Sequence, residues 1–295
     1  MVKHISSIVA LATAAFAQNT PAKPETTAPS FHVDIVGKGK PMILIPGFAS
    51  SGHTWDSTVA RYKDRFECHV LTLAGFAGQP ATNATPFLEN VRNDLAAYIR
   101  KNKMDKPVIV GHSLGGFMAL WLAEKEPDLV GPLVIVDSLP FLPAATQPGA
   151  TSDSVKPFAE NIRKIFSGPP TPDTDKMTET QVRAMVTKQE DYEMILAWGK
   201  KSDHITEGNA IYEMMTTDLR NDLDKIKSTA IVIGTWIAYK QYGVTRDGVE
   251  RNFRTQYAKL ANFDFILEDN ARHFVMLDDP DAFFAAMDAF LLGTK

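Results

Sequence analysis

A single cysteine, Cys68, stands in a chain of 295 residues. One thiol cannot form a disulfide within the chain, so a hydrophobic core has to stabilise the fold. The surrounding segment FECHVLTLAG, residues 66–75, is rich in strand-forming residues. We expect Cys68 to be a buried thiol in a strand, the usual place for a free cysteine.

An excess of positive charge is also missing. The formal net charge is -4 at pH 7, with no basic stripe and no acidic tail. The sequence therefore predicts no nucleic-acid partner. It contains no cluster with metal-ligand spacing and no phosphate-binding glycine loop, so we expect neither a metal nor another cofactor.

No hydrophobic run is long enough to cross a bilayer, and we expect no stable membrane anchor. Residues 1–17, MVKHISSIVALATAAFA, join a positive start to a short apolar stretch and a small-x-small site. This pattern predicts a cleaved signal peptide and a secreted or periplasmic protein. Residues 18–30, rich in Pro and Thr, are typical of a disordered linker.

From residue 31 onward, strand-like and helix-like segments alternate. Strands are expected at 31–36, 40–48, 68–75, 107–113 and 132–138, and again at 228–236 and 263–269, with a last helix over 280–292. Helical stretches separate most of them. This order predicts an α/β fold with a mostly parallel central sheet flanked by helices.

Residues 139–225 carry no convincing strand. Proline-rich breaks at 139–149 and 167–173 accompany amphipathic helices expected over 177–203 and 206–219. We interpret this segment as a helical cap inserted into a core formed by 31–138 and 226–295. Its larger apolar residues are typical of packing, although some could line a substrate pocket; they are Met177, Met185, Met194, Met214, Met215, Tyr192, Trp198 and Tyr212.

Ser113 lies in the segment GHSLGG, residues 111–116, between an expected strand and an expected helix. Gly111 and Gly115 flank it at the spacing of a nucleophile elbow, a sharp turn that exposes a serine hydroxyl at the edge of a sheet. The helix start behind it favours developing negative charge. The pattern predicts that Ser113 is a catalytic nucleophile.

A serine hydroxyl needs a base to take its proton. Among seven histidines, His273 is best placed, because it lies in a loop between the last expected strand and the closing helix. His112 precedes the serine and is expected to pack away from its hydroxyl. We expect a structural polar role for His53 and solvent exposure for His204.

These features together resemble the α/β-hydrolase family with an inserted cap. The elbow, the Ile45-Pro46-Gly47-Phe48 loop and the His273 loop follow in the family's order, covering residues 31 to 295 apart from the cap. The resemblance implies an oxyanion hole formed by the backbone N–H groups of Phe48 and Leu114. Many relatives have His-Gly where this chain has Pro46-Gly47. The oxyanion hole should be unaffected, because backbone amides and not side chains form it.

The acid that would orient His273 is less clear. Most relatives have an aspartate shortly after the strand expected at 228–236, and this chain has no carboxylate from 234 to 239. Asp137, at the end of the preceding strand, occupies a position that some family members use. Asp247, Asp269 and the lack of any acid partner remain alternatives, and Asp137 could instead cap the following turn.

A serine nucleophile forms an acyl-enzyme, whereas dehalogenation and epoxide opening in this fold use a carboxylate. The resemblance thus implies a carboxylic ester hydrolase acting on a small-molecule ester with a small to medium, apolar acyl group. An acyltransferase or cofactor-free haloperoxidase with the same triad is an alternative, as is a ligand-binding protein with slow turnover. The sequence leaves the oligomeric state open.

Overall fold

The computed structural model describes residues 30–82 and 84–293. The predicted signal peptide and nearly all of the predicted linker lie outside the described residues. Across the two described ranges, none of the helices combines the length and the apolar character needed to cross a membrane.

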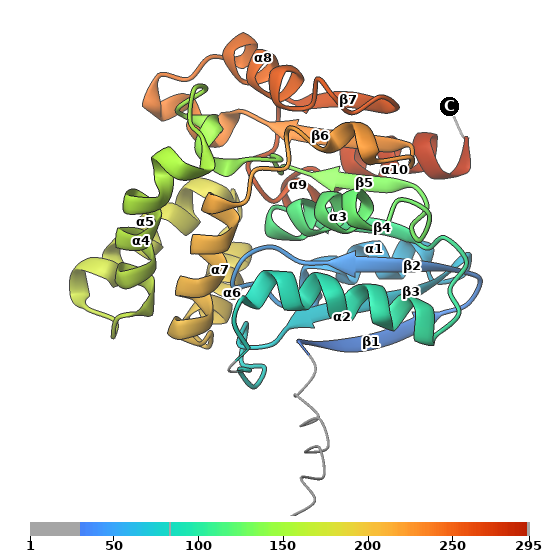
Figure 1. The fold of residues 1–295 in the computed structure, drawn as a ribbon, viewed down its shortest axis with the longest axis horizontal. Helices are drawn as coiled ribbons and strands as arrows, with labels where there is room; N and C mark the ends of the chain where they lie inside the picture. The colour runs from blue at the N-terminus through green and yellow to red at the C-terminus, as the bar shows by residue number, and fades with distance from the viewer. Residues whose placement is uncertain (1–29, 83, 294–295) are drawn as a thin grey trace, which may run out of the picture.

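A seven-stranded sheet forms the centre of the molecule, in the order β1-β3-β2-β4-β5-β6-β7 (Figure 1). The strands are β1 (Phe31–Gly37), β2 (Lys40–Ile45), β3 (Phe66–Leu73), β4 (Val108–His112), β5 (Leu133–Val136), β6 (Ala230–Thr235) and β7 (Phe263–Glu268). Only β1, at one edge, pairs antiparallel; the other pairings are parallel. The predicted fold class is confirmed.

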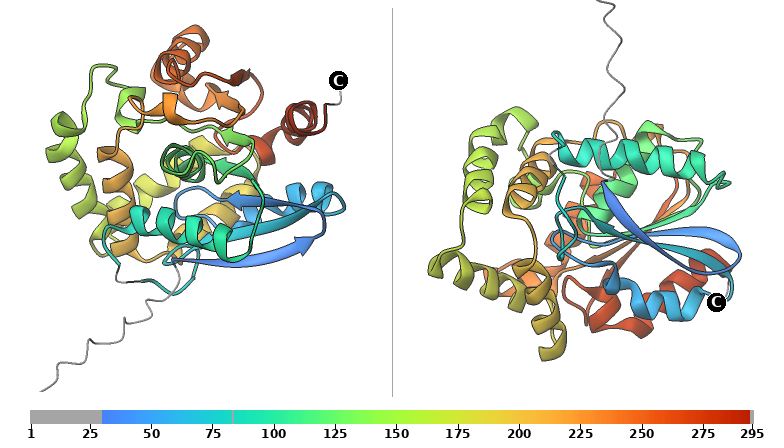
Figure 2. Two further views of the ribbon diagram at one scale, coloured as in Figure 1. Left: turned by 45° about the vertical axis from the view of Figure 1, so that its right-hand side comes forward. Right: turned by 90° about the horizontal axis from the view of Figure 1, so that it is seen from below.

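Helices cover both faces of the sheet (Figure 2). Helices α2 (Phe87–Lys101), α3 (Leu114–Lys125) and α8 (Arg246–Gln256) pack on one face, and α1 (Asp56–Tyr62), α9 (Val275–Asp278) and α10 (Pro280–Leu292) on the other. The internal strand β2 supplies Ile43 and Ile45 to one core and Met42 and Leu44 to the other. Burial on both sides explains its continuous apolar run. Cys68, in β3, is fully buried as expected.

Four helices lie between β5 and β6 and gather at one side of the sheet (Figure 1). They are α4 (Ser152–Ser167), α5 (Pro172–Met185), α6 (Gln189–Lys200) and α7 (His204–Thr216). The single helix expected over 177–203 is wrong, because the backbone is extended at Val186 and divides it into α5 and α6. Helix α4 was not expected, since Pro157 lies inside it and weakens the helical signal.

The four-helix segment is anchored to the core by Glu213 of α7. Helix α2 begins after Pro86, whose side chain cannot cap its free N–H groups. The Glu213 carboxylate accepts hydrogen bonds from the backbone N–H groups of Phe87 at 2.6 Å and Leu88 at 2.9 Å. A residue 125 positions later in the chain thus caps this helix.

Candidate active site

Ser113 occupies a strained turn between β4 and α3, with φ 52° and ψ -117°. The turn brings backbones so close that a Cβ on Gly115 would lie 2.1 Å from the carbonyl oxygen of Ile45, and one on Gly111 would lie 2.2 Å from that of Gly115. Only glycine fits at both places. A non-glycine residue in this conformation is uncommon and costs energy that the surrounding fold has to supply.

His273 is hydrogen-bonded to Asp137: its Nδ1 donates to Oδ2 at 2.6 Å. A carboxylate can only accept, so Nδ1 carries the proton and Nε2 of the neutral ring is left as an acceptor. This is the tautomer that a general base for a serine requires.

Asp137 follows β5 and is held in one orientation by its neighbour strand. It accepts from the backbone N–H of Thr235 on Oδ1 and from the Thr235 hydroxyl on Oδ2, both at 2.9 Å. Asp137 is 8% exposed, and its φ of 42° is unusual for a non-glycine residue. The sequence did not indicate a role for Thr235, because its contact with Asp137 depends on the pairing of β5 with β6.

The other carboxylates that the sequence left open lie elsewhere. Asp247 is exposed in the first turn of α8. Asp269 accepts hydrogen bonds from Trp236 Nε1 and from Arg246 Nε, each at 2.8 Å. Of these three aspartates, Asp137 is the one whose carboxylate contacts His273.

His112 is buried and contacts the loop that carries His273. It is completely buried, its ring lies 4.5 Å from that of His273 between centroids, and its Nε2 donates to the His273 carbonyl oxygen at 3.0 Å. Burial lowers the pKa of His112 well below its ordinary value, so the ring is neutral. His112 therefore supports the loop that carries His273.

His53 and His204 are not part of this cluster. His53 is exposed, with Nδ1 3.2 Å from the Asp56 carboxylate. His204, at the first turn of α7, keeps 41% of its side chain exposed and lies 3.4 Å from Glu207. The contact with Asp56 agrees with the structural polar role expected for His53, and the exposed side chain of His204 agrees with the solvent exposure expected there.

The loop after β2 packs against the elbow. A Cβ on Gly47 would lie 3.4 Å from Cβ of Ser113 and 2.9 Å from Nδ1 of His112. The backbone then turns at Ala49, where φ is 52°, and the Ser50 hydroxyl donates to the Phe48 carbonyl oxygen at 3.1 Å. The segment that carries the predicted oxyanion donor Phe48 thus adjoins the serine, as does Leu114, the first residue of α3.

Hydrogen bonds also join the His273 loop to the break between α5 and α6. Arg272 Nη1 donates to the carbonyl oxygens of Arg183 at 2.6 Å and Val186 at 3.0 Å. The backbone N–H of Phe274 donates to the carbonyl oxygen of Met185 at 3.3 Å. We call these contacts between residues 183–188 and 272–278 the cap latch.

Asp278 completes the cap latch with both carboxylate oxygens. Oδ1 accepts from the backbone N–H of Thr187 at 2.8 Å, and Oδ2 accepts from the Thr187 hydroxyl at 3.0 Å and from the backbone N–H of Arg272 at 2.9 Å. No local pattern predicts this role, because Thr187 and Asp278 lie 91 residues apart in the chain. The loop that carries His273 is thereby bound to Asp137 on one side and to the helical segment on the other.

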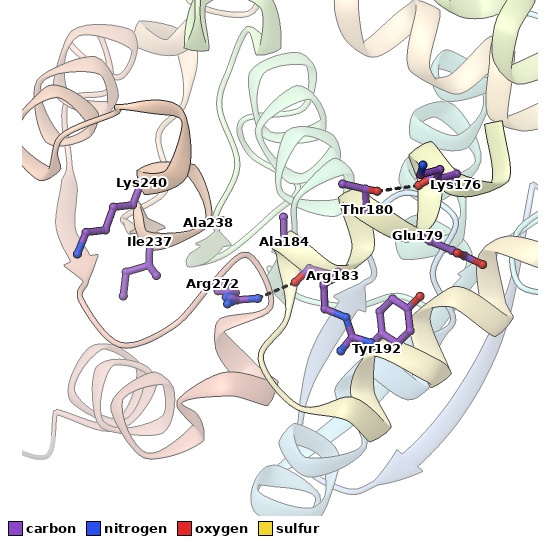
Figure 3. A pocket seen from close by; sticks show the side chains of 10 residues that line it. All are labelled: Lys176, Glu179, Thr180, Arg183, Ala184, Tyr192, Ile237, Ala238, Lys240 and Arg272. Atoms are coloured by element: carbon purple, nitrogen blue, oxygen red, sulfur yellow. Dashed lines mark hydrogen bonds between the residues drawn. The ribbon is translucent and has the colours of Figure 1, made fainter. Parts of the chain in front are cut away.

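A cleft of about 780 Å³ opens beside this loop, between α5 and the 3-10 turn η4 (Ile237–Tyr242) (Figure 3). It is lined by Lys176, Glu179, Thr180, Arg183, Ala184, Tyr192, Ile237, Ala238, Lys240 and Arg272. Neither Ser113 nor His273 lines it, so the cleft lies beside the loop of His273 and does not enclose Ser113. Of the apolar residues that the sequence offered for a pocket, Tyr192 alone lines this cleft; Trp198, Met214 and Met215 are buried in packing.

The part of the chain that the structure describes has no group of three or more His, Cys, Asp or Glu side chains placed to hold a metal ion.

Comparison with known proteins agrees with this geometry. The sequence model of the alpha/beta hydrolase family matches residues 42–286, most of the described chain. This chain belongs to the alpha/beta hydrolase family. The match spans the elbow, the segment of α4 to α7 and the His273 loop of this hydrolase.

Curated relatives of this alpha/beta hydrolase are named pimeloyl-[acyl-carrier protein] methyl ester esterases. One from Legionella pneumophila is 23% identical over 263 residues, which covers 89% of this chain and 99% of the relative. One from Nitrosomonas europaea is 28% identical and covers 69% and 79%. A solved esterase from Exiguobacterium antarcticum has the same fold, with a TM-score of 0.71 over 88% of this chain and 94% of its own, at 15% identity.

Proposed function

We propose that this protein is a serine-dependent carboxylic ester hydrolase with Ser113, His273 and Asp137 as its catalytic residues. The observation that carries the proposal is the His273–Asp137 hydrogen bond of 2.6 Å beside a serine in an elbow turn. A buried, oriented carboxylate stabilises the positive imidazolium that forms when the ring takes a proton.

The reaction follows from these roles. His273 Nε2 takes the proton of the Ser113 hydroxyl while Oγ attacks the ester carbonyl carbon. The backbone N–H groups of Phe48 and Leu114 stabilise the resulting oxyanion. The intermediate collapses, the alcohol leaves with the proton from His273, and the acyl group stays on Ser113. Water, deprotonated by His273, then attacks the acyl-enzyme and releases the carboxylic acid.

An apolar acyl group of small to medium size fits the surroundings of Phe48. Its ring packs edge-on against Phe76 at 5.4 Å and against Phe166 of α4 at 5.6 Å between centroids. Phe166 lies in the four-helix segment, which supports the assignment of residues 139–225 as a cap over the site. The ester chemistry named for the curated relatives supports the reaction class.

Export is part of the proposal, since residues 1–17 have the composition of a signal peptide. Expression of the full chain in a bacterial host, followed by N-terminal sequencing of the periplasmic fraction, tests it. A mature end at residue 18 is expected, and uncleaved protein confined to the cytoplasm would contradict export.

The catalytic proposal is tested with 4-nitrophenyl butyrate and a fluorescent fluorophosphonate. Ser113→Ala should lower the hydrolysis rate by about 10⁴-fold and abolish labelling, because the covalent nucleophile is gone. Ser57→Ala, on the exposed first turn of α1, is the matched control and should behave as the native protein. Labelling that persists in Ser113→Ala would refute the assignment.

A further inference from the structure

We propose that the cleft beside the His273 loop binds an anionic group of the substrate, so that the preferred substrates are esters bearing a carboxylate or a phosphate. The inference rests on the proposed function and specifies its substrate class. It starts from the charges that line the cleft (Figure 3).

The lining is strongly positive in a chain whose formal net charge is -4. Four cationic side chains line the cleft: Lys176, Arg183, Lys240 and Arg272. The single carboxylate, Glu179, lies 4.0 Å from Nζ of Lys200, which is not a lining residue. Positive charge gathered in a concave site attracts anions and raises their local concentration.

None of the four cations pairs with a carboxylate anywhere in residues 30–82 or 84–293. The Arg183 guanidinium lies 3.5 Å from the ring centre of Tyr192, and the Lys240 ammonium lies 5.6 Å from that of Trp236. Stacking on a ring holds an arginine in place while its N–H groups, which point outward in the guanidinium plane, stay available. Such donors suit a carboxylate or phosphate.

The same cleft offers an apolar surface at Ala184, Ile237 and Ala238. An alkyl chain attached to the anion can pack there, and a volume of about 780 Å³ holds a small molecule. The cleft is next to the catalytic cluster along the chain, because Arg272 precedes His273 and Ile237 follows Thr235 by two residues. Since Ser113 does not line the cleft, the anion and the ester must be separated by a spacer of several carbons.

Three esters of equal length test the proposal. They are the mono-4-nitrophenyl ester of suberic acid, 4-nitrophenyl octanoate and the 4-nitrophenyl ester of 8-aminooctanoic acid, which differ in the charge at the far end. At low salt we expect kcat/KM to be about tenfold higher for the anionic ester than for the neutral one, and lowest for the cationic ester. The preference should shrink as salt rises from about 0.02 to 0.5 M, because added ions screen the cleft.

The variant Arg183→Gln/Lys240→Gln removes two charges from the cleft and should lose about tenfold in kcat/KM for the anionic ester, mainly through KM. The change for octanoate should be less than twofold, because the cap latch uses only the backbone carbonyl oxygen of Arg183, which the substitution keeps. The control is Lys38→Gln/Lys101→Gln, two exposed lysines that precede β2 and end α2 and lie outside the cleft lining. It should change neither ester. Equal rates for anionic and neutral esters in the native protein, or equal losses for both in the cleft variant, would overturn the proposal.

Binding without turnover separates this proposal from the catalytic one. Glutarate and inorganic phosphate are titrated by calorimetry into Ser113→Ala, and into the same protein carrying the two cleft substitutions. If an anion binds to Ser113→Ala and the cleft substitutions abolish that binding, the anion site is supported. The anion that binds more tightly shows whether the cleft prefers a carboxylate or a phosphate. If neither anion binds, the anion site is refuted, even if the native protein hydrolyses octanoate. If hydrolysis persists in Ser113→Ala, the catalytic assignment is refuted and the anion site is not.

Discussion

Oδ2 of Asp137 lies 2.6 Å from Nδ1 of His273, although the two residues are 136 positions apart in the chain. The sheet brings them together, because β5 and β6 are parallel neighbours and Asp137 follows one while Thr235 ends the other. A carboxylate that accepts from both Thr235 and His273 has little freedom to turn.

Asp137→Asn should lower kcat by about 10²- to 10⁴-fold, because an amide in this place favours the wrong imidazole tautomer. Steady-state kinetics with 4-nitrophenyl butyrate measure the loss. Asp247→Asn, on exposed α8, is the control and should stay within about twofold of native. The reverse pattern, with Asp247→Asn impaired and Asp137→Asn active, would move the acid to Asp247.

Asp278→Asn should lower kcat by about tenfold with little change in KM, because it weakens the cap latch and loosens the loop that positions His273. The rate of fluorophosphonate labelling should fall in parallel. Thr187→Val, which removes one of the three hydrogen bonds to Asp278, should have a smaller effect in the same direction.

Asp281→Asn is the control for the cap latch, as an exposed aspartate in the first turn of α10. It should leave kcat unchanged. If Asp278→Asn lowers only the free energy of unfolding and is labelled at the native rate, the cap latch is structural and does not position His273.

Stability should depend on pH through Glu207. Burial raises the pKa of Glu207 to about 7 from its ordinary 4.5. Between these values the folded state binds more protons than the unfolded state, so the free energy of unfolding falls as pH rises from about 4.5 to 7. Glu207→Gln should remove this slope and be more stable than native at pH 8 by roughly 1–3 kcal/mol.

Urea unfolding at a series of pH values measures this effect. Glu190→Gln, on the exposed first turn of α6, should keep the native slope. A native slope in Glu207→Gln would mean that other groups carry the pH dependence.

Glu213→Ala should lower the free energy of unfolding by about 1–2 kcal/mol, because the N-terminal N–H groups of α2 lose their acceptor. Glu213→Gln keeps one acceptor oxygen and should lose less than half as much. Urea unfolding measures both variants. Equal losses in the two would show that packing of the side chain, rather than the hydrogen bonds, stabilises the helix.

The sequence predicted local features well where the chain itself encodes them. The glycines around Ser113 mark the turn, and α10 begins and ends at the residues expected for it, 280 and 292. Contacts between segments that are distant in the chain could not be predicted from the sequence. The sequence favoured Asp137 without deciding among three aspartates, because the choice depends on how strands pair, and the cap latch depends on a helix break at Val186 that interrupts no periodic pattern.

The position of Asp137 at the end of β5 has a consequence for how this scaffold can diversify. Thr235, the last residue of β6, binds the Asp137 carboxylate. The residues that follow it do not supply the acid, and Ile237, Ala238 and Lys240 line the cleft. Under the proposed function, this short segment is the place for saturation mutagenesis or loop exchange, because substitutions there should alter selectivity and leave the His273–Asp137 hydrogen bond in place.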